Sequence, residues 1–210
     1  MKGFQVQSMF LVAISISLCS CRSDISSVKD CFNEYKAAIL SRNGVKAVTL
    51  VDSSTFKLYS GLLEKVRLLD SSQLEKESLA TKFEVFKVRH MIESKEINGM
   101  DGKQLLTVLI NRGISGNGNI ESYSLGDIAI KNDSAQAQQL SEKKETPFRY
   151  LFIKEGQFWR IRTASSSHAP DIFFKQMAFS GGITVNEYIY KLLEDISRKK
   201  PSADIWRPIH

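Results

Sequence analysis

The chain is poor in the residues that build disulfide frameworks and metal sites. Its 210 residues include three cysteines and three histidines, whose spacing forms neither a Cys-x-x-Cys pair nor a Cys/His metal cluster. A glycine-rich phosphate loop, a Gly-x-Ser-x-Gly elbow and a His-Glu-x-x-His motif are also missing. We therefore expect no metal and no cofactor, and no motif identifies a reaction.

The chain also has no dense block of lysine or arginine, no internal repeat and no low-complexity tract. Its formal charge of +6 at pH 7 favours attraction to anionic surfaces. Without a basic arm, however, we expect no nucleic-acid binding. The length and an apolar fraction of 42% suit one globular domain with an appendage.

The apolar run at residues 9–18 is shorter than the roughly 20 residues that a membrane-spanning helix requires. It ends in Leu18-Cys19-Ser20-Cys21, which resembles the lipobox of bacterial lipoproteins, although Cys19 departs from the usual small or hydroxylated residue. The resemblance implies a signal peptide at residues 1–20, cleavage before Cys21 and a lipidated tether at residues 21–27. An ordinary secretory signal and an uncleaved anchor are the alternatives.

The lipobox resemblance also implies a place in the cell and a first partner. Acyl chains on Cys21 would hold the chain on a lipid membrane, because each buried methylene contributes about 0.8 kcal/mol. The implied location is the bacterial cell envelope. Arg22 follows the cysteine where an Asp would retain the protein at the inner membrane, so in a Gram-negative cell the outer membrane, facing the periplasm, is implied. The remaining Cys31 is expected to be a half-buried hydrophobic side chain.

Helical periodicity dominates the first half of the mature chain. Apolar spacing and N-cap residues predict helices at 28–41, at 45–51, at 72–91 with a break near Thr81, and at 101–111, and another that begins near Asp52. The segment 83–89 also alternates as a strand would, but its charged, helix-forming flanks favour a helix. Two more helices are predicted after Pro170 and after the capping box Thr184-Val-Asn-Glu187, and then a basic, mobile tail at residues 198–210.

Between these helical regions the apolar period changes to two, which predicts consecutive hairpins. The first joins residues 120–131 and 134–141 around Asn132-Asp133. The second spans residues 148–162, with a turn at Glu155-Gly156 and Phe152 opposite Trp159. Its buried face is expected to carry Phe148, Tyr150, Phe152, Trp159 and Ile161.

Helices followed by an antiparallel meander indicate an α+β fold. Three segments, Phe32-Asn-Glu-Tyr-Lys-Ala-Ala-Ile, Leu125-Gly-Asp-Ile-Ala-Ile-Lys-Asn-Asp-Ser-Ala-Gln-Ala and Tyr150-Leu-Phe-Ile-Lys-Glu-Gly-Gln-Phe-Trp-Arg-Ile, are together similar to the nuclear-transport-factor-2-like (SnoaL-like, cystatin-like) superfamily. The resemblance implies N-terminal helices packed on a curved sheet, in a cone-shaped domain at residues 28–163. Extra helices would be inserted in this domain and would follow it at residues 164–197. Members of the superfamily often form homodimers through the outer sheet face, which nothing in this sequence requires.

Enzymes of that superfamily use polar groups inside the cone, so four residues are candidates for catalysis. Asp127 lies in a strand that otherwise packs apolar groups, although its register favours a surface carboxylate. Tyr35 and Tyr59 lie on inward helical stripes, where a core role is the alternative. His90 lies on an amphipathic segment, where an exposed or hydrogen-bonded histidine is the alternative.

The most site-like feature of the sequence is a group of arginines on one predicted sheet face, Arg149, Arg160 and Arg162. Such a group could bind a carboxylate or a phosphate, and a solvated outer face is the alternative.

Three hypotheses for the function follow. The first is a non-enzymatic, membrane-tethered lipoprotein that binds a protein partner or a small apolar ligand. The second is an isomerase or hydratase-type enzyme that uses a hollow cone. The third is an inhibitor or immunity-type protein that acts through the arginines.

Overall fold

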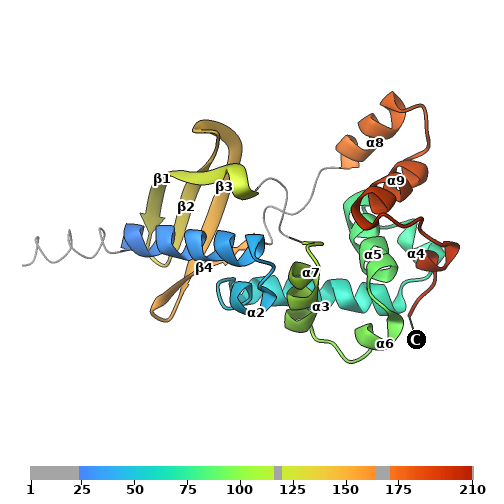
Figure 1. Cartoon of the computed structure of the whole chain (residues 1–210), viewed down its shortest axis with the longest axis horizontal. Helices are drawn as coiled ribbons and strands as arrows, with labels where there is room; N and C mark the ends of the chain where they lie inside the picture. Colours follow the sequence, from blue (N-terminus) through green and yellow to red (C-terminus); the bar gives the residue numbers. More distant parts are fainter. Residues whose placement is uncertain (1–23, 116–119, 164–170, 210) are drawn as a thin grey trace, which may run out of the picture.

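A computed structural model of the chain describes residues 24–115, 120–163 and 171–209. In this part of the chain, helices and one four-stranded antiparallel sheet form the α+β fold that the sequence predicts (Figure 1). The buried side chains fall into two clusters. We call the sheet with its covering helices the sheet lobe, and the remaining helices, which share the second cluster, the helical lobe.

The sheet is a meander in the order β1-β2-β3-β4. Its strands are β1 Tyr123–Lys131, β2 Ser134–Ser141, β3 Lys144–Glu155 and β4 Phe158–Arg162. The first predicted hairpin is confirmed, because Ile128 lies opposite Ala137 and Ile130 lies opposite Ala135. Its first strand begins later than predicted, because residues Ile120–Ser122 form the short 3-10 helix η1.

The second hairpin is also present, but its predicted register is wrong by two residues. Phe152 lies opposite Ile161 rather than Trp159. The turn residues are Gly156 and Gln157, and Gly156 takes the left-handed φ of +63°, which costs glycine little. A shift of two preserves the alternation of side chains. Phe152, Trp159 and Ile161 therefore still share one buried face.

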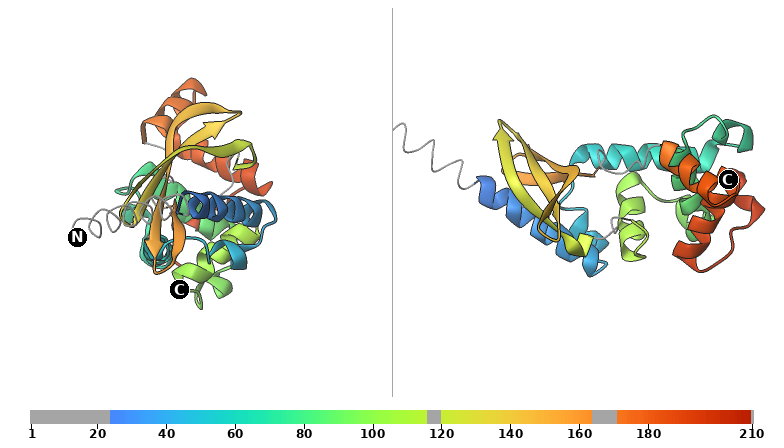
Figure 2. Two further views of the ribbon diagram at one scale, coloured as in Figure 1. Left: turned by 90° about the vertical axis from the view of Figure 1, so that its left-hand side faces the viewer. Right: turned by 90° about the horizontal axis from the view of Figure 1, so that it is seen from above.

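A helix over residues 24–40 lies across that face of the sheet (Figure 2). All six residues of its predicted apolar stripe are buried: Val28, Cys31, Phe32, Tyr35, Ala38 and Ile39. Phe32, Phe152 and Trp159 fill the space between helix and sheet, each at most 3% exposed. The helix already includes residues 24–27, which the sequence assigned to a tether. Asp24 accepts hydrogen bonds from Lys154 Nζ at 2.8 Å and Trp159 Nε1 at 3.1 Å.

Two helices connect the lobes, because each contributes side chains to both buried clusters. After α2 (Gly44–Ala47), Val51 pairs with Ile161 of β4, and the chain enters α3 (Ser53–Leu68). The other connecting helix, α7 (Gly102–Asn111), packs against α3. Asp52 caps α3 as the sequence predicts, and Asp101, predicted as the first residue of its helix, is the N-cap of α7.

The helical lobe contains α4 (Ser71–Leu74), α5 (Leu79–Met91), α6 (Ser94–Ile97), α8 (Asp171–Ser180) and α9 (Val185–Ser197). The helical prediction for residues 83–89 is confirmed. The capping box predicted at Ser72 and Glu75 lies instead at Asp70 and Gln73. Among the described residues, no helix combines the length and the hydrophobicity that crossing a bilayer requires.

The prediction of a mobile tail is wrong for residues 201–206, which pack on the helical lobe. Ile205, in the 3-10 helix η3 (Ala203–Trp206), is 3% exposed. The Trp206 ring packs edge-on against Phe86 with centroids 4.6 Å apart, and its Nε1 donates to the Tyr190 hydroxyl at 2.7 Å. Arg89 donates to the Ile205 carbonyl at 3.0 Å.

Candidate ligand-binding cleft

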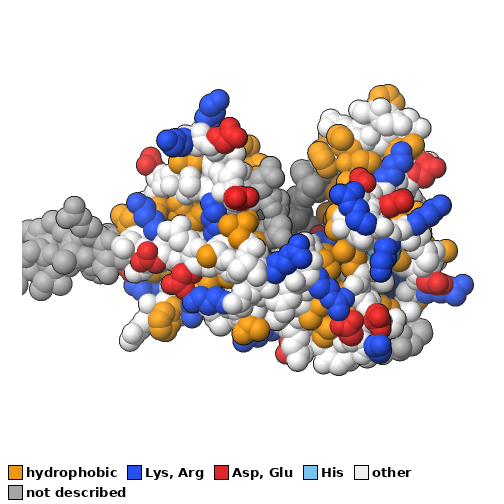
Figure 3. Space-filling view, viewed as in Figure 1, with side chains coloured by type: hydrophobic (Ala, Val, Ile, Leu, Met, Phe, Trp, Pro, Cys, Tyr) orange, Lys and Arg blue, Asp and Glu red, His pale blue; other side chains and the backbone are white. Residues whose placement is uncertain are grey.

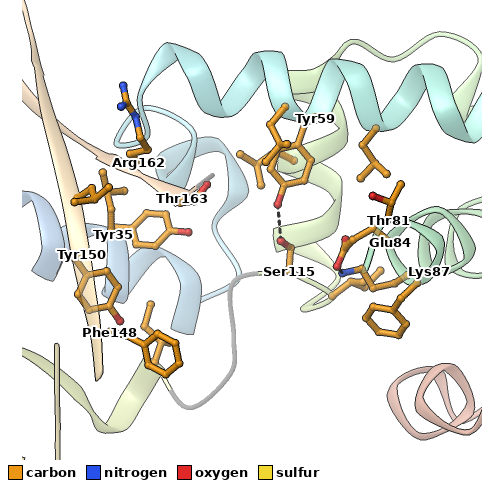
Figure 4. Close-up of a pocket in the computed structure, with 18 of the residues that line it drawn as sticks. Tyr35, Tyr59, Thr81, Glu84, Lys87, Ser115, Phe148, Tyr150, Arg162 and Thr163 are labelled. Atoms are coloured by element: carbon orange, nitrogen blue, oxygen red, sulfur yellow. Dashed lines mark hydrogen bonds and ion pairs between the residues drawn. The ribbon is translucent and has the colours of Figure 1, made fainter. Parts of the chain in front are cut away.

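A cleft of about 1030 Å³ lies between the two lobes. Figure 3 shows the molecule hollowed between its two bulky parts, and Figure 4 shows side chains from both lobes around the cavity. Its walls come from the helix at residues 24–40, from α3 and α5, from the middle of β3, and from the end of β4. The volume lies at the upper end of the roughly 300–1,000 Å³ typical of small-molecule sites.

Tyr35 reaches this cleft from the helix at residues 24–40. Its side chain points into the cavity (Figure 4) and is 5% exposed. Its hydroxyl has no hydrogen-bond partner among the described residues, and its oxygen is not one of their fully buried unpaired atoms, so it is accessible from the cavity. Burial, helped by the neighbouring Tyr59 and Tyr150, raises the pKa of the Tyr35 hydroxyl well above its usual range. At neutral pH the hydroxyl is therefore a protonated donor facing an open cavity.

Three further tyrosines line the cleft. The Tyr59 hydroxyl lies 3.0 Å from Ser115 Oγ, in a hydrogen bond within the wall. Burial raises the pKa of Tyr59, and it raises the pKa of Tyr150 to about 12. Tyr123 comes from the start of β1. Together the four rings give the cavity an apolar surface with polar tips.

The charged side chains of the cleft are mostly cations. Five are basic and one is acidic: Lys57, Lys65, Lys87, Arg149, Arg162 and Glu84. Three of the cations are paired, Lys87 with Glu84 at 2.6 Å, Arg162 with Asp52 at 2.7 Å, and Lys65 with Glu77. Lys57 and Arg149 have no ion-pair partner among the described residues. The cleft therefore carries an excess of positive charge at its exposed rim.

Asp52 fixes one wall of the cleft to the sheet. Its carboxylate accepts from Arg162 Nε at 2.7 Å, from Ser54 Oγ at 2.7 Å and from Thr55 Oγ1 at 2.8 Å. Burial opposes the charge, but these hydrogen bonds outweigh it and lower the pKa of Asp52 below its usual value. The α3 wall and the end of β4 are thereby held together.

The structure brings together only part of the predicted catalytic set. The enzyme hypothesis requires that at least two of the four candidates line a cavity. Tyr35 and Tyr59 line the cleft. Asp127 is exposed on β1, in agreement with the predicted surface carboxylate. His90 lies on α5 with its Nε2 2.8 Å from Ser197 Oγ, outside the cleft. The space between helix and sheet that the cone hypothesis considered is filled, and the cavity lies beyond it.

The three arginines share one face of the sheet, but only two of them reach the cleft. Arg149 and Arg162 line it, whereas Arg160 lies over the Phe158 ring with its Cζ 5.1 Å from the centroid. Cys31 is buried, and burial raises the pKa of its thiol to about 11, which fits the predicted hydrophobic role. Cys21 lies outside the described residues. Within the described ranges, no group of three or more His, Cys, Asp or Glu side chains could hold a metal ion.

Sequence reasoning missed the contributions of Lys57, Phe83 and Lys87 to the cleft. Each lies on a helix whose pattern shows which residues are apolar, but not that α3 and α5 face the middle of β3 across a cavity. Compared with protein-family models, curated proteins and solved structures, the chain gave no match.

Proposed function

We propose that the protein is a cell-envelope lipoprotein, tethered through an acylated Cys21, that binds a ligand in the cleft between its lobes. The observation that carries the binding function is Tyr35, a largely buried side chain whose hydroxyl has no partner among the described residues and faces a cavity of about 1030 Å³. A bound ligand with an acceptor group would satisfy it. The positions of Asp127 and His90 outside the cleft support binding rather than acid–base catalysis by the predicted set.

The cleft is tested by filling it. Both buried clusters consist of residues from Val28 onward, so a soluble chain that begins at Arg22 keeps every contact within them. A Cβ added at Gly61 meets no atom within 4 Å, and Gly61 lines the cleft. Gly61→Phe should therefore abolish binding of the fluorescent probe anilinonaphthalene sulfonate. Gly99→Phe, at an equally open glycine outside the cleft, should retain it. Equal binding by both variants would refute the site.

The tether is proposed from the lipobox resemblance and is supported by the short distance to the fold. Two residues separate Cys21 from Asp24, so the three Cα–Cα steps span at most about 11 Å, and Asp24 is hydrogen-bonded to the sheet. Cys21→Ala should remove labelling by radioactive palmitate and release the protein from the membrane fraction. Labelling that persists in this variant would exclude the anchor.

We further propose that the sheet lobe is a reduced relative of the nuclear-transport-factor-2-like cone. The support is a helix at residues 24–40 lying across an antiparallel meander. An experimental structure with strands curved around this helix would agree with the proposal, whereas a flat sheet would argue against it.

A further inference from the structure

We infer that the ligand of the cleft is an amphipathic anion, with an apolar body and one carboxylate or phosphate group. This inference rests on the proposed binding function and names the chemistry that the cavity selects. Three properties of the cleft carry it: its apolar wall, its cations without acidic partners among the described residues, and a hydroxyl donor that faces the cavity.

The apolar wall selects the body of the ligand. Besides the four tyrosines, the lining includes eleven apolar side chains: Leu58, Leu62, Phe83, Leu106, Ile114, Ile120, Pro147, Phe148, Leu151, Ile161 and Ile196. Phe148 is 63% exposed, although it lies on the strand face that is buried farther along β3. Covering such surface contributes about 25 cal/mol per Å². An acyl chain or an aromatic body would gain this energy, and a fully hydrophilic anion would not.

The cations select the sign of the charged group. Glu84 is the acid of the lining, and Lys87 neutralises it. Lys57 on α3 and Arg149 on β3 stand at two different walls without acidic partners among the described residues. A carboxylate or phosphate between these walls would gain charge-assisted hydrogen bonds. A cationic amphiphile would meet uncompensated positive charge.

Tyr35 supplies a donor for the polar end of the ligand or for an ester oxygen beside it. The Tyr59 hydroxyl is already hydrogen-bonded to Ser115 Oγ within the wall. The Tyr35 hydroxyl faces the cavity and has no partner among the described residues, so a ligand acceptor would not have to displace a protein partner. Removing it by Tyr35→Phe should weaken an acceptor ligand without opening a cavity.

A partner protein that docked on the arginine face would require a different set of side chains. Such a surface would include Arg160, which lies on the same sheet face as Arg149 but outside the cleft. The two arginines therefore distinguish a ligand in the cleft from a protein on the sheet face.

The test is displacement of anilinonaphthalene sulfonate from the soluble chain that begins at Arg22. The competitors are laurate, dodecyl phosphate, dodecyltrimethylammonium and dodecyl maltoside, all below their micelle concentrations. The two anions should displace the probe at concentrations at least about tenfold lower than the cation or the neutral compound, the ratio that loss of one charge-assisted hydrogen bond predicts. Lys57→Gln and Arg149→Gln should each weaken dodecyl phosphate by about tenfold, and Arg160→Gln should not.

The outcomes separate the inference from the function on which it rests. Equal displacement by the anionic, cationic and neutral compounds would overturn the inference and leave ligand binding intact. If Arg160→Gln weakened the binding of dodecyl phosphate as much as Arg149→Gln does, the inference would also be overturned, and a site on the sheet face would be indicated instead. Absence of any probe binding to the unmodified chain would overturn the binding function itself.

Discussion

At the scale of single residues, Asp52 joins the two parts of the molecule. It caps α3, its backbone N–H donates to the Ile161 carbonyl at 3.0 Å, and its carboxylate pairs with Arg162. The carboxylate is 1% exposed, whereas Arg162 remains partly open to solvent. Loss of the carboxylate would therefore remove the ion pair between α3 and β4, but the Arg162 guanidinium would still be partly solvated.

We predict that Asp52→Ala lowers the free energy of unfolding by about 2 kcal/mol, a value below that of a fully buried pair because Arg162 is partly solvated. The pKa of Asp52 is lower in the folded than in the unfolded state. Its stabilising contribution is thus present above about pH 4 and is lost as the pH falls through the folded-state pKa. Urea unfolding across this range measures both effects. Asp127→Asn, at an exposed carboxylate, should change the unfolding free energy by less than about 0.5 kcal/mol. An equal loss in both variants would contradict this role.

For the tyrosines of the cleft we predict the opposite pH dependence, a loss of folding stability at high pH. The pKa of Tyr150 is raised to about 12, so the folded state holds its proton more tightly than the unfolded state does. The corresponding stability is complete below about pH 10 and is lost as the pH rises toward 12. Unfolding monitored through tyrosinate absorbance should show this loss, and Tyr150→Phe should reduce it. An unchanged alkaline profile in that variant would contradict the burial of the hydroxyl.

At the scale of elements, the contact between α3 and α7 shapes one side of the cleft. A Cβ added to Gly102, at the start of α7, would come within 2.5 Å of the Phe56 carbonyl and within 2.5 Å of the Ser60 amide. Gly61, on the cleft side of α3, has open space instead. The two glycines therefore have different roles, one in close packing and one facing a cavity.

We predict that Gly102→Ala destabilises the fold by about 2 kcal/mol, because backbone must move to admit the methyl group. Gly61→Ala should stabilise it by about 0.5–1 kcal/mol through helix propensity. Thermal unfolding of the two variants provides the comparison. Stabilisation by Gly102→Ala would show that α7 does not pack closely on α3.

The C-terminal segment provides a second test at this scale. Ile205→Ala should cost about 2–4 kcal/mol, because the side chain is buried in the helical lobe. Ile172→Ala on α8, where the side chain is 62% exposed, should change the unfolding free energy by less than about 0.5 kcal/mol. Denaturant unfolding that found both changes small would restore the interpretation of residues 198–210 as a tail.

Features that depend on neighbouring residues were predicted from the sequence more accurately than contacts between residues far apart in the chain. Helix caps such as Asp52 and Thr184 are predictable because their partners lie three residues away. The second hairpin was predicted with the wrong register, since shifts by two residues leave the apolar pattern unchanged. The packing of Trp206 could not be predicted because its partners, Phe86 and Tyr190, are distant along the chain.

At the scale of the whole molecule, the candidate site depends on how the two lobes meet. Lys57, Glu84 and Arg149 come from α3, α5 and β3, segments that have no sequence pattern in common. The sequence predicted Arg149 and Arg162 as site residues from their strand, and Tyr35 and Tyr59 from their helices, but could not place all four around one cavity. A lipid on Cys21 would hold the sheet lobe near the membrane, because Asp24 is bonded to Trp159 and Lys154.

The most direct test of the account is fluorine NMR of the chain labelled with fluorotyrosine and titrated with dodecyl phosphate. Four of the six tyrosines line the cleft, and the other two, Tyr188 and Tyr190, lie on α9 in the helical lobe. The account predicts that the signals of Tyr35, Tyr59, Tyr123 and Tyr150 shift on binding while those of Tyr188 and Tyr190 stay unchanged. Shifts confined to Tyr188 and Tyr190, or no shift at all, would contradict it.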